Sequence, residues 1–285
     1  MEKRIKKVAA IHDLSGYGKA SLTVVIPTLS AMGIQVCPLP TAILSAHTGF
    51  NGFTFLDLTD EMEKIVAHWK SLNLQFDAIY SGYLGSPEQV DIVSNLIQDF
   101  RKNNPLVVVD PVMGDDGKLY DGMNRGMVAK MRELIGMADL ITPNLTEAAF
   151  LATGVYKEKP ELQEIIDWMR ILADGGPRFV IITSAPADDA GQGSVIIFDR
   201  KADLFFRFCH ERLPGYYSGT GDTFASLITG YLLKEYALLP AVDMAMQFIS
   251  LAIVKTREFG EKEICLEAAL EKVNQITSSY AYEGL

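Results

Sequence analysis

The segment Gly219-Thr220-Gly221-Asp222 combines residue types that can act on a negatively charged group. It precedes an apolar run, beginning at Thr223, that predicts a helix. The first N–H groups of a helix have no intrahelical acceptor, and the helix dipole makes that end positive. The two glycines let the backbone approach a ligand closely. We therefore predict an anion-binding loop in which Asp222 takes a proton from an alcohol during phosphoryl transfer.

A purely structural interpretation of this loop stays open, because an acidic residue in the first turn of a helix also complements the dipole. That dipole favours the ionised carboxylate, so Asp222 is expected to be a weak base. Position matters more than basicity when phosphoryl transfer passes through a loose transition state. The assignment of chemistry to this loop therefore depends on the rest of the chain.

Short β-rich runs alternate with helical patterns along most of the chain. The expected strands are residues 8–11, 35–38, 78–81, 106–109, 140–141 and 179–183, followed by an antiparallel hairpin of 194–199 and 204–210. The expected helices are 20–32, 61–72, 87–102, 126–135, 162–173, 223–235, 241–257 and 266–279. This alternation predicts βαβ units, a mostly parallel sheet with helices on both faces, and a single α/β domain over residues 1–285.

Polar residues follow the expected strands, and ligands of open α/β sheets bind beyond the carboxyl ends of the strands. These residues include Asp13, Tyr83, Asp110, Asp115, Asn144, Glu147 and Ser184. Asn144 and Glu147 also match a capping box, which explains the pair without a ligand. Alternatively, they orient phosphate oxygens and the waters of Mg²⁺, an ion that takes few protein ligands. Residues 12–19 match neither a Walker A loop nor a complete dinucleotide fingerprint.

The composition narrows the choice of partners and compartment. The chain has 285 residues, 48% of them hydrophobic, and a net charge of −10, which argues against nucleic acid or an anionic membrane as a partner. No apolar run approaches membrane-spanning length. Cys37, Cys209 and Cys265 are scattered, which favours a reduced cytoplasmic compartment over disulfides or a zinc site. Residues 186–193 predict a mobile loop between two strands.

Five segments resemble the pyridoxal kinases of the ribokinase-like superfamily in order and spacing. They are residues 41–49, 81–86, 110–115, 141–144 and 219–222. The last segment is common to the superfamily, whereas Ser45-Ala46-His47-Thr48-Gly49 and Ser81-Gly82-Tyr83 point to the vitamin B6 branch. The resemblance implies a three-layer αβα sandwich with a small antiparallel edge. It also implies a homodimer without the separate lid of ribokinase.

The activity implied by this resemblance is ATP- and Mg²⁺-dependent phosphorylation of the 5′-hydroxymethyl group of pyridoxal, pyridoxine or pyridoxamine. Asp222 would be the base, and the amides of Gly219, Thr220 and Gly221 would stabilise the γ-phosphoryl group. The nucleotide side would comprise Asp115, Tyr120, Asn144, Glu147, Thr183, Ser184 and Thr220, with Asp115 and Glu147 at the metal. The vitamer side would comprise Asp13, His47, Thr48, Tyr83 and Asp222. A monovalent cation is a further expectation.

Asp13 departs from the family, because many pyridoxal kinases carry serine there. The segment Asp13-Leu14-Ser15-Gly16 is similar instead to the Asp-Pro-Ser-Gly of hydroxymethylpyrimidine kinases. A carboxylate at this position favours an amine-bearing substrate, so we predict a preference shifted toward pyridoxamine. Alternatively, Asp13 only caps the next helix. Two other functions stay open: a hydroxymethylpyrimidine kinase of thiamine synthesis, and a non-catalytic nucleotide- or vitamer-binding protein of the same fold. The intact Asp222 argues against the latter.

Overall fold

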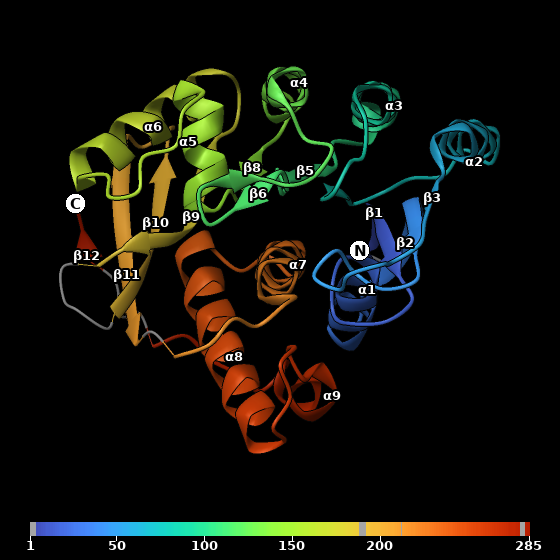
Figure 1. Ribbon diagram of the computed structural model, residues 1–285. Coiled ribbons are helices and arrows are strands. Elements are labelled where there is room, and N and C mark those ends of the chain that lie inside the picture. Colours follow the sequence, from blue (N-terminus) through green and yellow to red (C-terminus); the bar gives the residue numbers. More distant parts are fainter. Residues whose placement is uncertain (1–3, 188–191, 212, 280–282) are drawn as a thin grey trace. The chain divides into compact units, whose positions relative to one another are not determined.

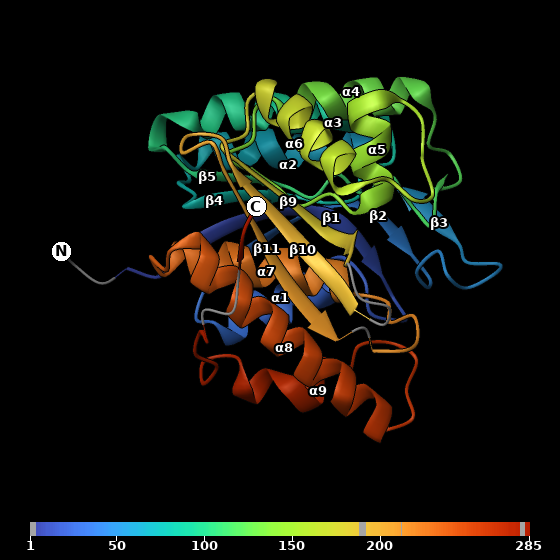
Figure 2. The ribbon, with the colours of Figure 1, turned by 90° about the vertical axis from the view of Figure 1, so that its left-hand side faces the viewer.

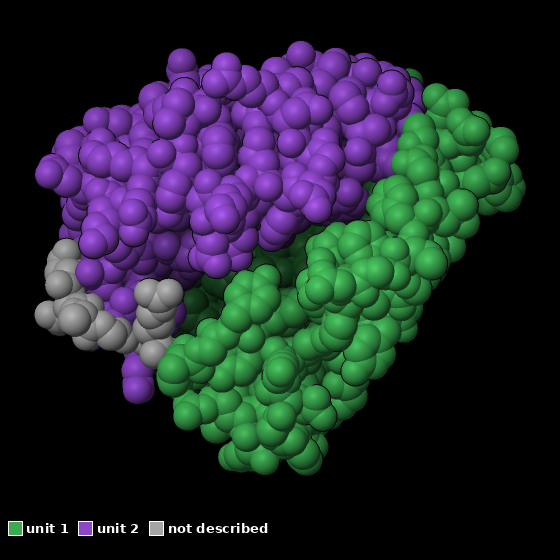
Figure 3. Space-filling model, in the orientation of Figure 1, with its two compact units in different colours: residues 1–82, 100–105, 213–281 green, residues 83–99, 106–212, 282–285 purple. Residues whose placement is uncertain are grey.

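The computed structural model describes residues 4–187, 192–211, 213–279 and 283–285. Its contacts group the chain into two compact units, coloured separately in Figure 3. The first unit comprises residues 1–82, 100–105 and 213–281, and the second comprises 83–99, 106–212 and 282–285. The single domain expected from the sequence stays a prediction.

The strands of the first unit lie in the order β3-β2-β1-β4. They are β1 (Lys7–Ser15), β2 (Gln35–Leu44), β3 (Phe55–Asp57) and β4 (Ala78–Ser81). Strand β1 pairs in parallel with both β2 and β4, and β2 pairs antiparallel with β3. The apolar residues Val8 to Ile11 of β1 are completely buried, as expected of a central parallel strand.

The helices of the first unit cover both faces of these strands (Figures 1 and 2). They are α1 (Leu22–Ala31), α2 (Thr59–Ser71), α7 (Thr220–Leu233), α8 (Leu238–Glu258) and α9 (Leu266–Ala269). Helix α1 packs on β1 and β2 and against α7, and α8 packs against α7 and α9. Helix α2 contacts β2 from the opposite face. This arrangement brings the beginnings of α1 and α7 together.

Helix α8 is long and apolar enough to cross a membrane by length and composition, against the expectation from the sequence. It has 21 residues, and the mean hydropathy of its most apolar window is 1.5. Its buried Asp243 accepts hydrogen bonds from Ser278 Oγ at 2.7 Å and from the Ser279 N–H at 2.5 Å. These contacts and the packing against α7 and α9 are typical of a core helix.

The second unit contains a parallel part and an antiparallel part. Strands β5 (Leu106–Val109), β8 (Leu140–Ile141) and β9 (Phe179–Pro186) are parallel, and β10 (Gln192–Asp199), β11 (Leu204–Glu211) and β12 (Glu283–Gly284) follow antiparallel. Strands β6 (Gly114–Asp115) and β7 (Lys118–Leu119) form a separate ribbon. The expected hairpin is confirmed, because Asp199 pairs with Leu204 across its turn.

Four helices belong mainly to the second unit. They are α3 (Pro87–Phe100), α4 (Arg125–Ile135), α5 (Leu145–Thr153) and α6 (Leu162–Asp174), and a 3₁₀ turn, Arg101–Asn103, follows α3. Helix α5 packs against α4, α6 and β9. The capping box at its start was expected from the sequence, but the helix itself was not among the expected elements.

Several expected elements differ in length from those observed. Strand β1 continues to Ser15, so Asp13 lies within the strand, and β2 continues to Leu44. The helix expected over 266–279 is wrong beyond the 3₁₀ turn Leu270–Lys272. There Ser278 and Ser279 bind Asp243 and so make tertiary hydrogen bonds in place of a continued helix. Of the loop expected over 186–193, residues 188–191 lie outside the described residues.

Candidate active site

The loop before helix α7 has the geometry expected of an anion cradle. Gly219 is the N-cap with φ 84°, and a Cβ there would lie 2.7 Å from the Lys19 carbonyl oxygen, so only glycine fits. The first intrahelical bond runs to the Gly219 carbonyl at 2.9 Å. The amides of Thr220 and Gly221 therefore have no acceptor within the helix. Gly221 is exposed, and a Cβ there would meet no described atom within 4 Å.

Asp222 is held beside these amides by the first unit. Its Oδ2 accepts a hydrogen bond from the Ser21 N–H at 2.8 Å. The residue keeps some exposure, yet desolvation by the surrounding protein raises the pKa of the carboxyl to about 7. The Ser21 N–H opposes this rise, and the negative charge of Asp13 adds to it. The weak base expected from the helix dipole is therefore wrong, because desolvation outweighs the dipole. A pKa near neutrality suits a general base.

Asp13 is buried in β1, with 6% of its surface exposed. Its Oδ1 accepts from Ser21 Oγ at 2.5 Å and its Oδ2 from Ser15 Oγ at 3.2 Å. Burial raises the pKa of Asp13, and these two hydroxyl groups oppose the rise. Helix α1 begins at Leu22 with Ser21 as the N-cap. Asp13 therefore does not cap the helix, which removes that alternative.

Both ring nitrogens of His47 have partners in the first unit. Nδ1 accepts from the Gly49 N–H at 3.1 Å, so Nε2 carries the proton and donates to Glu263 Oε1 at 3.3 Å. Its ring also packs against Phe50, with the centroids 4.8 Å apart. Thr48, the next residue in the chain, is exposed. A contact between His47 and a pyridine ring would therefore use the imidazole face.

Sequence reasoning missed Glu263, which lies between α8 and α9. Besides pairing with His47, Glu263 accepts a hydrogen bond from the Lys19 N–H. No local pattern marks this glutamate, since it lies 216 residues from His47 in the chain.

In the second unit, Asn144 and Glu147 form the capping box at the start of α5. Asn144 Oδ1 accepts from the Glu147 N–H at 2.9 Å, and Glu147 Oε2 accepts from the Asn144 N–H at 2.9 Å. The other carboxylate oxygen accepts from the Met113 N–H at 3.1 Å. Glu147 is 3% exposed, and burial, with the charge of Asp110 added, raises its pKa well above the usual range. The capping box expected for Asn144 and Glu147 is confirmed. A bound cation would reduce the repulsion between the charges of Glu147, Asp110 and Asp115.

The remaining nucleotide-side residues gather at the same end of α5. Asn144 Nδ2 donates to the Gly114 carbonyl at 2.8 Å, which fixes the ribbon that carries Asp115. The bonds that complete the group are Tyr120 N–H to Met113 carbonyl at 2.9 Å, Thr183 N–H to Pro143 carbonyl at 3.2 Å, and Leu145 N–H to Ser184 Oγ at 3.3 Å. Tyr83 is the first residue of this unit and is half-buried.

The expected metal ligands have only oxygen donors, as Mg²⁺ prefers. Asp115 is half-buried with its pKa raised by burial, and its charge also raises the pKa of Glu147. Within the described part of the chain, no group of three or more His, Cys, Asp or Glu side chains is placed to hold a metal. An ion that keeps most of its water and takes one or two carboxylates still fits these residues.

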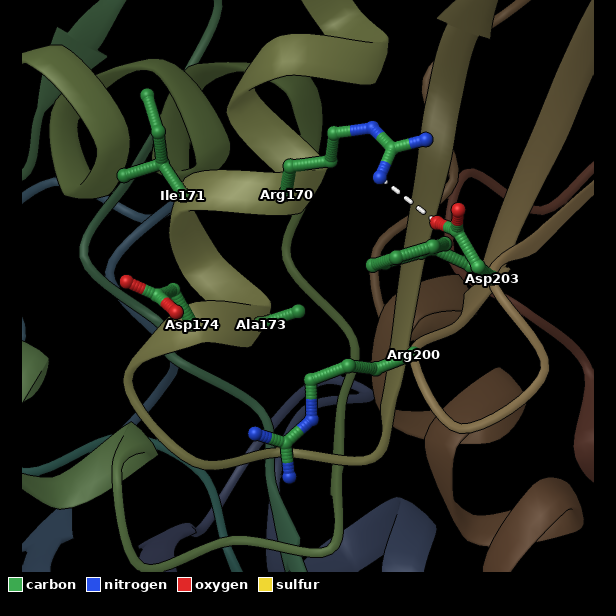
Figure 4. Close-up of a pocket in the computed structure, with 7 residues that line it drawn as sticks. Arg170, Ile171, Ala173, Asp174, Arg200 and Asp203 are labelled. Carbon is green, nitrogen blue, oxygen red and sulfur yellow. Dashed lines mark hydrogen bonds and ion pairs between the residues drawn. The ribbon is translucent and has the colours of Figure 1, made fainter.

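Two pockets of the second unit hold none of the predicted site residues. Figure 4 shows one of about 440 Å³, lined by Arg170, Ile171, Ala173, Asp174, Phe198, Arg200 and Asp203. Arg170 points to Asp203 there and pairs with it at 2.7 Å. The other, of about 530 Å³, is lined by Asp116, Gly117, Lys118, Tyr156 and Glu158, next to Asp115 in the chain.

Comparison with known proteins agrees with this geometry. The model of the phosphomethylpyrimidine kinase family matches residues 18–267. A pyridoxine/pyridoxal/pyridoxamine kinase of Bordetella avium is 30% identical over 270 residues, which cover 91% of this chain and 88% of that protein.

Solved structures extend the similarity to the whole chain. A phosphomethylpyrimidine kinase of Bacteroides thetaiotaomicron, in a crystal form with pyridoxal, is 50% identical, covers 99% of this chain and 100% of its own, and has a TM-score of 0.94. The pyridoxal kinase of Lactobacillus plantarum is 33% identical, covers 95% of this chain and 98% of its own, and has a TM-score of 0.86.

Fold and sequence together define a kinase of the ribokinase-like superfamily with the three-layer α/β fold expected from the sequence. Within that superfamily the chain belongs to the phosphomethylpyrimidine kinase family and is of the pyridoxal kinase type.

Proposed function

We propose that this kinase transfers the γ-phosphoryl group of ATP to the 5′-hydroxymethyl group of pyridoxal, pyridoxamine or pyridoxine, with Asp222 as the base. The observation that carries this proposal is the placement of Asp222 in the first turn of α7, next to exposed Gly221 and with a pKa of about 7. The relatives named for vitamin B6 kinase activity support the substrate class.

The chemistry assigns one step to each part of this loop. Asp222 takes the proton of the hydroxymethyl group as its oxygen forms a bond to the γ-phosphorus. The bond between the γ-phosphorus and the bridging oxygen breaks, and its electron pair leaves with ADP. The amides of Gly219, Thr220 and Gly221 stabilise the charge on the transferring group, because their dipoles are already oriented.

The second unit would bind the nucleotide and the metal ion. We assign the nucleotide to Asp115, Tyr120, Asn144, Glu147, Thr183, Ser184 and Thr220. When bound, Mg²⁺ supplies charge neutralisation for the phosphate oxygens. Asp115 and Glu147 would hold its water ligands, and a monovalent cation is a further proposed component.

The vitamer would contact Asp13, His47, Thr48 and Tyr83. The carboxylate of Asp13 motivates the proposed shift toward pyridoxamine, although Ser15 and Ser21 already donate to its two oxygens. If Asp13 sets the preference, Asp13→Asn should lower kcat/KM for pyridoxamine more than for pyridoxal. An equal kcat/KM for the two vitamers, unchanged in the variant, would remove this proposal.

The first experiment is an ATP-consumption assay with pyridoxal, pyridoxamine, pyridoxine and hydroxymethylpyrimidine. We expect a vitamin B6 vitamer to give the highest kcat/KM. A higher value for hydroxymethylpyrimidine would favour the thiamine-pathway alternative, which the name of the matching family raises. Binding of ATP and pyridoxal without turnover in the presence of Mg²⁺ would favour a non-catalytic binding protein.

The second experiment replaces the base. Asp222→Asn should lower kcat by about 10²–10⁴-fold with an unchanged circular dichroism spectrum, because the amide cannot accept the proton. Asp174→Asn is the matched control, since Asp174 is exposed and lies outside the predicted site. Activity of Asp222→Asn within about twofold of the control would contradict the role of Asp222 as the base.

We also propose that the protein is a cytoplasmic homodimer. The three cysteines are free in the structure, which agrees with a reducing compartment. Light scattering should give twice the 31.4 kDa mass of the chain, and a monomer mass at micromolar concentration would contradict the dimer.

A further inference from the structure

Ser21 has a backbone conformation that serine rarely adopts. Its φ is 52° and its ψ is −128°, a combination that glycine tolerates and other residues rarely adopt. Such a conformation is strained and persists only where the surrounding structure imposes it. Ser21 is also the N-cap of α1, yet its side chain makes no capping hydrogen bond. Its hydroxyl group must therefore serve another purpose.

The hydroxyl and the amide of Ser21 connect two carboxylates of the first unit. Ser21 Oγ donates to Asp13 Oδ1 at 2.5 Å, and the Ser21 N–H donates to Asp222 Oδ2 at 2.8 Å. Asp13 is fixed in turn by the Ser15 hydroxyl at 3.2 Å and by its place in the buried strand β1. The chain of contacts runs from the central strand, through Ser21, to the first turn of α7.

This arrangement leaves one oxygen of Asp222 available. Among the described residues, no hydrogen bond reaches Asp222 Oδ1, while Oδ2 is held by Ser21. Because the hydrogen bond fixes Oδ2, the orientation of the carboxylate and therefore the direction of Oδ1 are also fixed. The charge of Asp13 also contributes to the raised pKa of Asp222.

We propose that Ser21 is a positioning residue for phosphoryl transfer. Its side chain is anchored by Asp13, its backbone is strained, and its N–H orients the Asp222 carboxylate toward the acceptor alcohol. This inference rests on the proposed role of Asp222 as the base. It explains why a residue under strain occupies a turn that glycine would adopt freely, because glycine lacks the hydroxyl group that binds Asp13.

Ser21→Gly separates positioning from stability. Glycine relieves the backbone strain but loses the hydrogen bond to buried Asp13, so these opposing effects should leave the melting temperature nearly unchanged. Without the anchor to Asp13, kcat with pyridoxal should fall by about 10–100-fold, since a small misplacement of a reacting group has effects of this size. The KM values for ATP and pyridoxal should stay within about threefold, because Ser21 is assigned no binding role.

Three further variants complete the test. Thr23→Ala is the matched control, because among the described residues Thr23 Oγ1 bonds to the Ala20 amide and to the Gly18 and Ala20 carbonyls of the same turn and to neither carboxylate. It should keep kcat within about twofold. Asp13→Ala should lower kcat with pyridoxal more than Asp13→Asn, since asparagine can still accept from the Ser21 hydroxyl.

The outcomes distinguish this inference from the proposed function. A Ser21→Gly enzyme with the kcat of the Thr23→Ala control, alongside an inactive Asp222→Asn, would overturn the positioning role alone. An active Asp222→Asn would overturn the base itself. A loss confined to KM in Ser21→Gly would also contradict positioning. Ser21→Gly remains informative even if Asp13→Ala fails to fold.

Discussion

Asp222 shows how two opposing effects set the properties of one side chain. The dipole of α7 and the Ser21 N–H both favour the ionised carboxylate. Removal from water disfavours it, and the neighbouring Asp13 adds repulsion. Desolvation prevails and raises the pKa to about 7. Asp222 can thus act as a base near neutral pH. An exposed aspartate at the same helix terminus would have a much lower pKa.

The pH dependence of catalysis should report this pKa. The base must be ionised to accept a proton, so kcat/KM for pyridoxal should fall about tenfold per pH unit below a pH of about 7. Asp13→Asn removes a negative charge that raises the pKa of Asp222, so the acidic limb should move to lower pH. The measurement is kcat/KM between pH 5 and 9 with saturating ATP, corrected for the ionisation of the vitamer. A profile that stays flat down to pH 5 would contradict the assignment.

Residues that act through local sequence were predictable, and residues that act through distant contacts were not. Gly219 and Asp222 carry their signal in one short segment, and Asn144 and Glu147 carry theirs in a capping box. The contact between Ser21 and Asp222 joins positions 201 residues apart. It also depends on a backbone conformation that serine does not favour. No local pattern encodes either property.

At the scale of elements, strand β2 is longer than the sequence indicated. Strand β2 was expected to end at Pro38. The observed strand continues through Pro40, which pairs with His12 of β1, and the register then shifts before Leu14 pairs with Ile43. This extension carries the polypeptide as far as Leu44, immediately before the segment that contains His47.

Three connections of the first unit meet at Glu263. A parallel bridge joins Ser218, next to the N-cap of α7, to Glu263, and the Ser218 hydroxyl donates to the Lys19 carbonyl at 3.0 Å. Glu263 itself binds the Lys19 amide and His47. Glu263 thereby links the anion-binding loop before α7, the turn before α1 and the segment that contains His47.

Glu263→Ala should therefore impair more than one step. The loss of these bonds frees His47 and the Lys19 turn, so we expect the pyridoxal KM to rise about tenfold and kcat to fall by a similar factor. Glu267→Ala is the matched control, because exposed Glu267 pairs with the Lys19 ammonium group, whereas Glu263 accepts from the Lys19 N–H. Steady-state kinetics at saturating ATP provides the measurement. Equal parameters for the two variants would show that Glu263 only contributes surface charge.

At the scale of the whole molecule, the predicted residues divide between two compact units. Most of the expected nucleotide and metal residues belong to the second unit, whereas Asp222, its supporting residues and His47 belong to the first. The fold class was predictable because alternating strands and helices admit few architectures. The division into units was not, because the first unit combines residues 1–82 with the distant residues 213–281 and a short middle segment, residues 100–105.

This division predicts that nucleotide binding and vitamer binding can be impaired separately. Glu147→Gln keeps an oxygen that accepts from the Asn144 N–H, but glutamine cannot carry a negative charge. In the native protein the charges of Asp110 and Asp115 disfavour ionisation of Glu147. We expect the KM for ATP to rise about tenfold and the Mg²⁺ requirement to increase, since fewer charges attract the ion. The Kd for pyridoxal, measured by its absorbance, should stay within about twofold, because the residues assigned to the vitamer are unchanged.

Exposed Glu133, which pairs with Lys130 at 3.0 Å, supplies the matched control Glu133→Gln. If Glu147 only caps α5, Glu147→Gln will lower the melting temperature and leave the Mg²⁺ dependence equal to that of the control. That result would contradict a role at the metal.

Asp222→Asn should show the complementary behaviour, because the base affects transfer and not the binding of ATP. Its ATP affinity should match that of the control while its turnover is lost. Weakened binding of both ligands in Glu147→Gln would show that the residue supports the fold as a whole.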